Sequence, residues 1–306
     1  MEIKKAAIVG FGAIGATYGR RLYNLMGDDF AVIAGGSRAK RLRENGETIN
    51  GEKIMPLVVE PDDKIWKADL VIFSVKNYQL ESAINDVKNI ITPDTVILTI
   101  LNGVSARDKI KEVYPENTVL YGLSKSDAER TPEGIKCSWE GTIQFGEADN
   151  TVISPQVKAV KELFDKAKIP NEICQDMIRA VWMKFMRNVG MNQLSSATGS
   201  PYWGFGGIPE LNRALREVMR EVMLIAQSKG INIDENDLEE CVRIAVNSEP
   251  NSKTSMLQDM EAGRKTEVDS FSGVVIEEGL KNGVPTPWNN CLYLILKTKE
   301  KLNGIK

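Results

Sequence analysis

The sequence predicts an α/β protein, with an N-terminal doubly wound parallel sheet of the Rossmann type and an all-helical C-terminal domain. A glycine-rich turn follows the first apolar segment, and apolar, β-branched segments alternate with helix-like segments up to about residue 150. From about Ser154, helical periodicity takes over and strand signals nearly vanish. We therefore expect a sheet domain over residues 1–170, with Pro170 as a hinge, and a helical domain over residues 171–306.

The glycine-rich turn lies between an apolar run starting at Ala6 and a helix-like segment ending at Met26. Gly10 permits a sharp turn, Gly12 leaves room for a pyrophosphate, and Gly15 lets the helix pack closely. The free N–H groups and dipole of the helix start bind phosphates. A tight turn without a ligand is the alternative, but the strand-turn-helix context favours a dinucleotide site. Its predicted residues are Gly10, Phe11, Gly12, Ala13, Ile14 and Gly15.

The remaining elements follow from hydrophobic periodicity. Strands are predicted at residues 30–34, 69–75, 94–101 and 118–122, and a hairpin at 135–138 and 142–146. Helices of the sheet domain are predicted at residues 40–45, 78–90 and 105–113. Helices of the second domain are predicted at residues 177–196, 212–229, 234–247, 255–262, 267–282 and 288–302.

Composition excludes several classes of function. The net charge of −3 gives no general attraction for nucleic acid or anionic membranes, and no apolar run approaches the roughly 20 residues of a membrane span. The chain has no histidine, which excludes Ser-His-Asp and Cys-His catalysis and histidine-ligated zinc. The four cysteines are far apart and form no C-x-x-C, so we expect no metal site but buried free thiols. With no room for a signal peptide before the first strand, we expect a cytoplasmic protein.

The residues after the second strand favour NADP over NAD. An NAD site usually has a carboxylate there to bind the ribose 2′-hydroxyl. Here residues 34–41 contain no carboxylate, and Ser37 and Arg38 suit a 2′-phosphate. A solvated helix start is the alternative reading, and we keep it for Lys40. We therefore predict that Ser37 and Arg38 bind NADP.

Polar residues directly follow two of the apolar strands. Lys76 comes after the strand at 69–75, and Asn102 after the strand at 94–101. Ligands of such sheets lie outside the carboxyl ends of the strands. An amide there can orient a nicotinamide or a substrate oxygen, and a lysine can bind a carboxylate. An exposed loop lysine is the alternative for Lys76.

The first helix of the second domain carries a polar row. Lys184, Asn188 and Asn192 recur at i, i+4 and i+8 and so lie on one face. Asparagine is a poor helix former, so this row suggests a surface that hydrogen-bonds a polar ligand, although a solvated face is the alternative. Glu267 opens a later helix, where it either compensates the dipole or orients Lys184.

These features together resemble the ketopantoate reductase (2-dehydropantoate 2-reductase) family over nearly the whole chain. The family belongs to the 6-phosphogluconate-dehydrogenase-like group of two-domain NADP enzymes. The segments that carry the resemblance are Gly10–Gly15, Ser74–Lys76, Leu101–Gly103, Trp182–Lys184 with Asn188 and Asn192, Ser255–Asp259 and Thr266–Asp269.

The resemblance implies a role for each of these residues. Lys184 would be the proton donor, and Asn102, Asn188, Asn192 and Ser255 would bind the substrate. The cofactor would also contact Lys76, Asn102, Ala128 and Glu267. Three positions depart from the family pattern: Gly35 stands where an arginine is common, and Tyr202 and Ser252 stand where asparagines are common.

The implied activity is NADPH-dependent reduction of ketopantoate to pantoate, in pantothenate and coenzyme A biosynthesis. A reductase for another 2-oxo acid and a non-catalytic NADP-binding regulator are the alternatives. The implied ligands are NADPH and a small 2-oxo acid, with no nucleic acid, membrane or metal, and the long C-terminal helices could support a homodimer.

Overall fold

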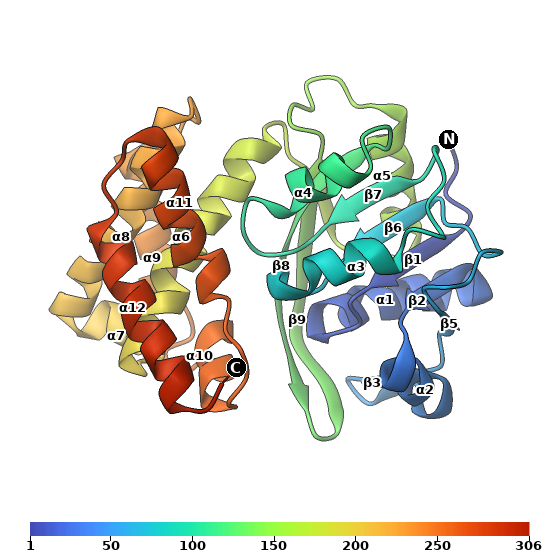
Figure 1. The fold of residues 1–306 in the computed structure, drawn as a ribbon, viewed down its shortest axis with the longest axis horizontal. Helices are drawn as coiled ribbons and strands as arrows, with labels where there is room; N and C mark the ends of the chain where they lie inside the picture. The colour runs from blue at the N-terminus through green and yellow to red at the C-terminus, as the bar shows by residue number, and fades with distance from the viewer. Residues whose placement is uncertain (306) are drawn as a thin grey trace. The chain divides into compact units, whose positions relative to one another are not determined.

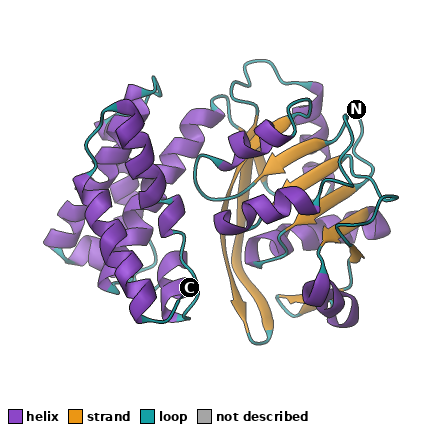
Figure 2. Cartoon of the chain, in the orientation of Figure 1, coloured by secondary structure: helices purple, strands orange, loops and turns teal. Residues whose placement is uncertain are grey.

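The computed structural model describes residues 1–305, which form two compact units, residues 1–178 and 179–305. The first unit is α/β and the second is helical, which confirms the predicted fold class (Figures 1 and 2). The first unit extends past the predicted end at residue 170, because Asn171–Ile173 (β10) pairs in parallel with β9 (Gly134–Gly146). Pro170 thus precedes a strand of the sheet.

The first unit is built on one sheet, whose main path runs β4-β3-β9-β8-β7-β6-β1-β2-β5. Neighbouring strands from β8 to β5 on this path are parallel. Starting from β1, strands β2 and β5 follow in chain order on one side, and strands β6, β7 and β8 follow in chain order on the other side. The switch point of a doubly wound sheet therefore lies between β1 and β6. The strands on this path are β1 Ala6–Val9, β2 Phe30–Ile33, β3 Glu47–Ile49, β4 Glu52–Ile54, β5 Leu57–Val59, β6 Leu70–Phe73, β7 Val96–Thr99, β8 Val119–Thr131 and β9.

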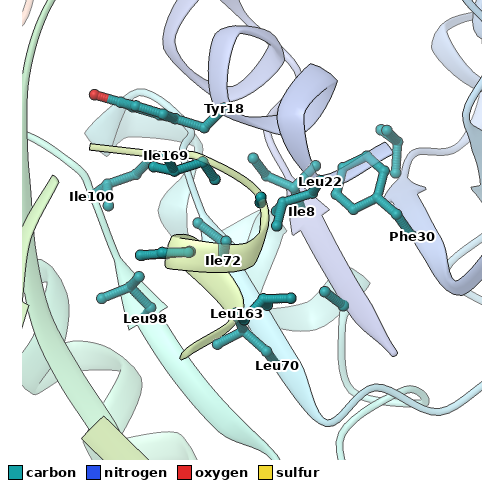
Figure 3. Packing of buried hydrophobic residues seen from close by; sticks show 14 of the residues in the cluster. Ile8, Tyr18, Leu22, Phe30, Leu70, Ile72, Leu98, Ile100, Leu163 and Ile169 are labelled. Atoms are coloured by element: carbon teal, nitrogen blue, oxygen red, sulfur yellow. The ribbon is translucent and has the colours of Figure 1, made fainter. Parts of the chain in front are cut away.

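Alternating residues of the central strands pack on opposite faces of the sheet. On one face, Ile8 and Ile72 pack with Tyr18 and Leu22 of α1 and with Leu163 of α5 (Figure 3). The strand residues that alternate with these point to the other face of the sheet, where they pack against α3 and α4. The β-strand period of two explains why these segments are apolar throughout. The helices of this unit are α1 Ala13–Met26, α2 Gly36–Asn45, α3 Leu80–Asp86, α4 Ala106–Val113 and α5 Pro155–Lys166, with short 3₁₀ turns η1 Gly27–Asp29 and η2 Asn77–Gln79.

The predicted hairpin within residues 135–146 is wrong. These residues form the single strand β9, which pairs antiparallel with β8. Gly141 does not make a turn: its φ is +62° and it lies beside the register shift that follows Lys125 of β8, which marks a bulge. A Cβ at Gly141 would clash with the carbonyl oxygen of Lys125, so only glycine fits there.

A short hairpin, β3 with β4, was not predicted. Its turn is Asn50-Gly51, with φ values of +49° and +81°. Asn-Gly is the dipeptide preferred in such two-residue turns, because both positions need positive φ. The sequence therefore contained a usable signal for this hairpin.

The second unit agrees with the predicted helices except near Glu267 and after residue 198. Glu267 precedes a separate 3₁₀ turn, η3, and α11 begins only after Phe271, whose ψ of −90° interrupts the helix. A short helix, α7, was also not predicted. The elements are α6 Met177–Thr198, α7 Trp203–Gly207, α8 Pro209–Ser228, α9 Glu235–Val246, α10 Ser255–Glu261, η3 Val268–Ser270, α11 Ser272–Asn282 and α12 Pro287–Leu302.

A buried carboxylate on α8 holds the start of α12. Glu221 accepts hydrogen bonds from the backbone N–H of Trp288 (2.7 Å) and of Asn289 (3.0 Å) and from the Asn289 side chain (2.7 Å). Gln193 of α6 donates to Asn289 Oδ1 (3.1 Å) and accepts from the N–H of Ser272, the first residue of α11 (3.2 Å). This network fixes α6 against α8, α11 and α12.

Removing that carboxylate should strongly destabilise the second unit. Glu221→Ala removes the acceptor of two backbone N–H groups, of which that of Asn289 is buried, and one of the two acceptors of the Asn289 side chain, so we expect the free energy of unfolding to fall by about 3 kcal/mol. Glu217→Ala, on the same helix, removes only the half-exposed partner of Arg220 and should cost less than about 0.5 kcal/mol. Urea unfolding followed by far-UV circular dichroism measures both, and equal stabilities would contradict this account.

The cysteines do not all match the prediction of buried thiols. Cys137 and Cys241 are buried, whereas Cys174 is half-buried and Cys291 is exposed. Cys291 lies on α12 on a face that this unit does not cover. Burial raises the pKa of the Cys174 and Cys241 thiols to about 11. No helix within residues 1–305 is long and apolar enough to cross a membrane.

Candidate functional site

The turn after β1 is held against the loop after β6. The N–H of Ser74 donates to the carbonyl of Val9 (2.9 Å), and Gly10 has a φ of +95°. A Cβ at Gly10 would lie 2.5 Å from the carbonyl carbon of Ser74, and one at Gly15 would lie 2.1 Å from the carbonyl oxygen of Gly10. Both glycines are therefore required by close packing of the backbone.

Gly12 differs from these two glycines. It precedes the first residue of α1, is exposed, and has no other atom within 4 Å of where a Cβ would be. The first turn of α1 carries no acidic residue, and its N-cap residue, Gly12, has no side chain to cap the helix. The open backbone and the helix dipole at this point fit the pyrophosphate of a dinucleotide. Phe11 is buried, and Ala13 and Ile14 are half-buried beside it.

The loops after β6 and β7 are joined by a side chain. Asn77 Nδ2 donates to the carbonyl oxygen of Asn102 (2.8 Å). Lys76 is half-buried and immediately precedes η2. The structure thus joins the loop of Lys76 to the loop of Asn102 at the carboxyl edge of the sheet, on the β6 side of the switch point.

Ser37 and Arg38 lie exposed in the first turn of α2, directly after β2. Asp86, near the end of α3, is close enough to Arg38 for their charges to interact. Burial raises the pKa of the Asp86 carboxyl, and the positive charge of Arg38 opposes that rise. Ala128 is half-buried in β8 and pairs with Cys137 of β9.

Sequence reasoning missed an arginine at the glycine-rich turn. Arg130, on β8 two residues beyond Ala128, donates from Nη2 to the carbonyl oxygen of Phe11 (3.4 Å). Arg130 also forms an ion pair with Glu47 at the start of β3, and so does Arg41 of α2. No local pattern could have identified this cluster, because its members come from three separate elements.

In the second unit, two predicted substrate residues contact each other. Asn192 is buried, and its Oδ1 accepts hydrogen bonds from Ser255 Oγ (3.2 Å) and from the N–H of Met256 (3.2 Å). Thr254 caps α10 by accepting from the N–H of Leu257 (3.3 Å), so Ser255 is fixed in the first turn of that helix. Ser255 itself remains exposed.

Lys184 and Asn188 lie on α6, two turns and one turn before Asn192, and both are half-buried. Successive members of this row are about 6 Å apart along the helix. The opposite side of α6 is buried: Phe185 packs on Trp182 with ring centroids 5.7 Å apart, and Phe185 also contacts Phe271 (6.4 Å). The polar row therefore keeps a defined orientation within this unit.

Glu267 is buried, and the segment around it is anchored to α12. Its carbonyl oxygen accepts from the N–H groups of Ser270 (2.9 Å) and Phe271 (3.0 Å). The neighbouring Thr266 donates from its N–H (2.9 Å) and its hydroxyl (2.6 Å) to Glu300. This places Glu267 one 3₁₀ turn before Phe271, whose ring packs on Phe185 of the helix that carries Lys184.

The two departures from the family pattern on the second unit lie together. The N–H of Tyr202 donates to the carbonyl oxygen of Ser252 (3.1 Å), which lies three residues before Ser255 in the segment that leads into α10. Tyr202 packs on Phe205 with a centroid distance of 6.2 Å. The aromatic side chain of Tyr202 therefore belongs to the segment that contacts the chain just before α10.

Two family profiles match the chain. One, described as ketopantoate reductase PanE/ApbA, matches residues 6–150, and the other, its C-terminal domain, matches residues 176–300. A 2-dehydropantoate 2-reductase of Pyrococcus horikoshii is 28% identical over 303 residues, covering 98% of this chain and 99% of the relative.

Solved structures agree over the full length. A 2-dehydropantoate 2-reductase from Methylococcus capsulatus is 25% identical with a TM-score of 0.85, covering 99% of this chain and 98% of that chain. D-mandelate dehydrogenase, in a ternary structure with NADH and anilino(oxo)acetate, shares the fold at 24% identity and a TM-score of 0.86, covering 99% of this chain and 100% of that chain.

Proposed function

The chain belongs to the ketopantoate reductase PanE/ApbA family of oxidoreductases, and from this premise we propose that it reduces ketopantoate to pantoate with NADPH. The observation that carries the proposal is the hydrogen bond between Asn192 and Ser255. It joins α10 to the helix of Lys184 and Asn188, so that four polar groups suited to a hydroxylated 2-oxo acid belong to one surface.

The first unit supplies the cofactor site in this proposal. The start of α1 at Gly12 would hold the pyrophosphate, with the turn from Gly10 to Gly15 around it, and Lys76, Asn102 and Ala128 would contribute further contacts. Glu267 of the second unit would add one more contact to the cofactor. NADP is favoured over NAD because Ser37 and Arg38, without a carboxylate, follow β2. When bound, the nicotinamide supplies the hydride that reduces the ketone.

Lys184 acts as the general acid. Its ammonium group donates a proton from Nζ to the ketone oxygen as that oxygen becomes an alkoxide, and its charge stabilises the developing negative charge. Asn188, Asn192 and Ser255 hydrogen-bond the hydroxyl and carboxylate of the substrate, and Asn102 orients it. Solvent then returns a proton to Lys184.

A specific observation favours a second candidate, the reduction of an aryl-substituted 2-oxo acid. Tyr202 and Ser252, which stand where asparagines are common, contact each other, and Ser252 lies three residues before Ser255 in the chain. A phenol ring in place of an amide offers less hydrogen bonding and more apolar contact to a substrate side chain. D-mandelate dehydrogenase, which has the same fold, acts by its name on an aryl acid.

Loss of NADPH absorbance at 340 nm with ketopantoate, phenylglyoxylate and 2-oxoisovalerate separates these candidates. We expect the largest kcat/KM with ketopantoate, and a larger value with phenylglyoxylate would favour the second candidate. NADPH binding without oxidation by any 2-oxo acid would contradict both and leave a non-catalytic regulator.

We also place the reaction in the cytoplasm, in keeping with the free cysteines, and propose a homodimer. Support for the dimer comes from large apolar side chains exposed on the last two helices of the second unit, namely Leu280, Leu294, Ile295 and Leu302.

A further inference from the structure

A buried carboxylate lies between two arginines beside the glycine-rich turn. Glu47 is only 4% exposed, and its Oε2 accepts from Arg41 Nη2 (3.1 Å) and from Arg130 Nη2 (2.9 Å). Burial alone opposes ionisation, but the arginine hydrogen bonds outweigh it and hold the pKa of Glu47 below its usual value. The carboxylate is therefore ionised at neutral pH, and the group of Arg41, Glu47 and Arg130, here called the arginine cluster, carries one net positive charge.

The arginine cluster connects the glycine-rich turn to the start of the helix after β2. Arg130 reaches the turn through the carbonyl oxygen of Phe11, and Arg41 belongs to α2. In doubly wound sheets, the adenosine ribose of a dinucleotide lies between these two elements. The cluster therefore flanks the expected position of the ribose.

The arginine cluster contains two guanidinium cations and only one carboxylate. One guanidinium would satisfy Glu47, and a second cation adds repulsion unless an anion completes the group. The side chains of Arg41 and Arg130 are 42% and 44% exposed, although their shared acceptor is buried. Each guanidinium has five N–H donors, and Glu47 and Phe11 use only some of them. Donors thus remain for a solvent-side anion.

We propose that Arg41 and Arg130, positioned by Glu47, supply the main positive charge of the subsite that binds the 2′-phosphate of NADP, in addition to the contacts proposed above for Ser37 and Arg38. This rests on the proposed function in assuming a nicotinamide dinucleotide. Gly35 has no side chain to contact the phosphate, and the charge of Arg38 is partly offset by the nearby Asp86. The pyrophosphate has its own place at the start of α1, which leaves the monoester phosphate of the ribose as the anion on the α2 side.

The test uses two ligands that differ only in this phosphate, adenosine 2′,5′-bisphosphate and AMP. Calorimetric titration of the full chain should show that Arg130→Ala and Arg41→Ala each weaken bisphosphate binding about tenfold, while AMP affinity changes less than about twofold. Arg43→Ala is the matched control, because Arg43 also lies on α2 but pairs with Glu60. It should leave both affinities unchanged.

Three outcomes would overturn the subsite: unchanged bisphosphate affinity in both variants, equal weakening of both ligands, or an equal effect of Arg43→Ala. If an alanine variant fails to fold, a crystal structure of the unaltered chain with the bisphosphate decides. The 2′-phosphate within hydrogen-bond distance of Arg41 or Arg130 supports the subsite, and its location away from both contradicts it.

The subsite and the reaction can fail separately, because these titrations require no turnover. A chain that prefers the bisphosphate over AMP through Arg41 and Arg130, but reduces no 2-oxo acid, would refute only the reaction. A chain that reduces ketopantoate while both variants bind the bisphosphate normally would refute only the subsite.

Discussion

Lys184→Ala is expected to lower kcat for ketopantoate reduction about 1,000-fold while leaving NADPH affinity within about threefold of the unaltered chain. The variant removes both the proton donor and the positive charge that stabilises the alkoxide, and general acid catalysis alone contributes 10²–10⁴-fold. NADPH binding depends mainly on the turn at Gly10–Gly15 in the first unit, which this substitution does not touch. Steady-state absorbance at 340 nm gives kcat, and titration of nucleotide fluorescence gives the dissociation constant.

The control for this variant lies on the same helix. Arg187→Ala removes a half-buried cation that lies close enough to Cys241 of α9 for its charge to act on that thiol. We expect its kcat to stay within about threefold of the unaltered value. Added methylamine should partly restore turnover to Lys184→Ala, because a small amine can occupy the space and donate the proton. Near-normal turnover of Lys184→Ala without amine would remove the lysine from the mechanism.

Alanine substitutions at two glycines of the turn should distinguish an effect on NADPH affinity from an effect on the free energy of unfolding. Gly12→Ala places a methyl group where no atom lies within 4 Å, at a φ of −86° that alanine adopts readily. We expect the free energy of unfolding to change by less than about 1 kcal/mol. NADPH affinity should nevertheless fall about 100-fold, since the methyl group occupies the space for the pyrophosphate.

Gly10→Ala should instead damage both properties. Its φ of +95° is strained for alanine, and the new Cβ would lie 2.5–2.6 Å from backbone atoms of Ser74 and Val75. We expect a loss of about 3 kcal/mol in stability together with loss of NADPH binding. Urea unfolding and nucleotide titration measure the pair. Normal NADPH affinity in Gly12→Ala would show that the phosphates bind elsewhere.

Local sequence patterns were sufficient to predict most elements of the fold. The apolar runs that became β1, β2, β6 and β7 are buried on both faces, so their composition identifies them without knowledge of their neighbours. The same holds for Lys184, Asn188 and Asn192, because helical spacing alone places them on one face.

Features that depend on distant pairing could not be predicted in the same way. Gly141 reads as a turn residue locally, but its partner strand lies near Lys125, and the pairing makes it a bulge. The end of the first unit depends on β10 pairing with β9, which no local pattern near Pro170 indicates. Arg130 lies 119 residues from Phe11 in the sequence, so only the fold reveals their contact.

The most direct test of the central claim is a crystal structure of the chain with NADP and pantoate. The proposal predicts the pyrophosphate against the backbone of Gly12, and Lys184 Nζ within hydrogen-bond distance of the C2 hydroxyl of pantoate. Pantoate bound away from Lys184, with that side chain directed into solvent, would contradict the assignment of Lys184 as the proton donor.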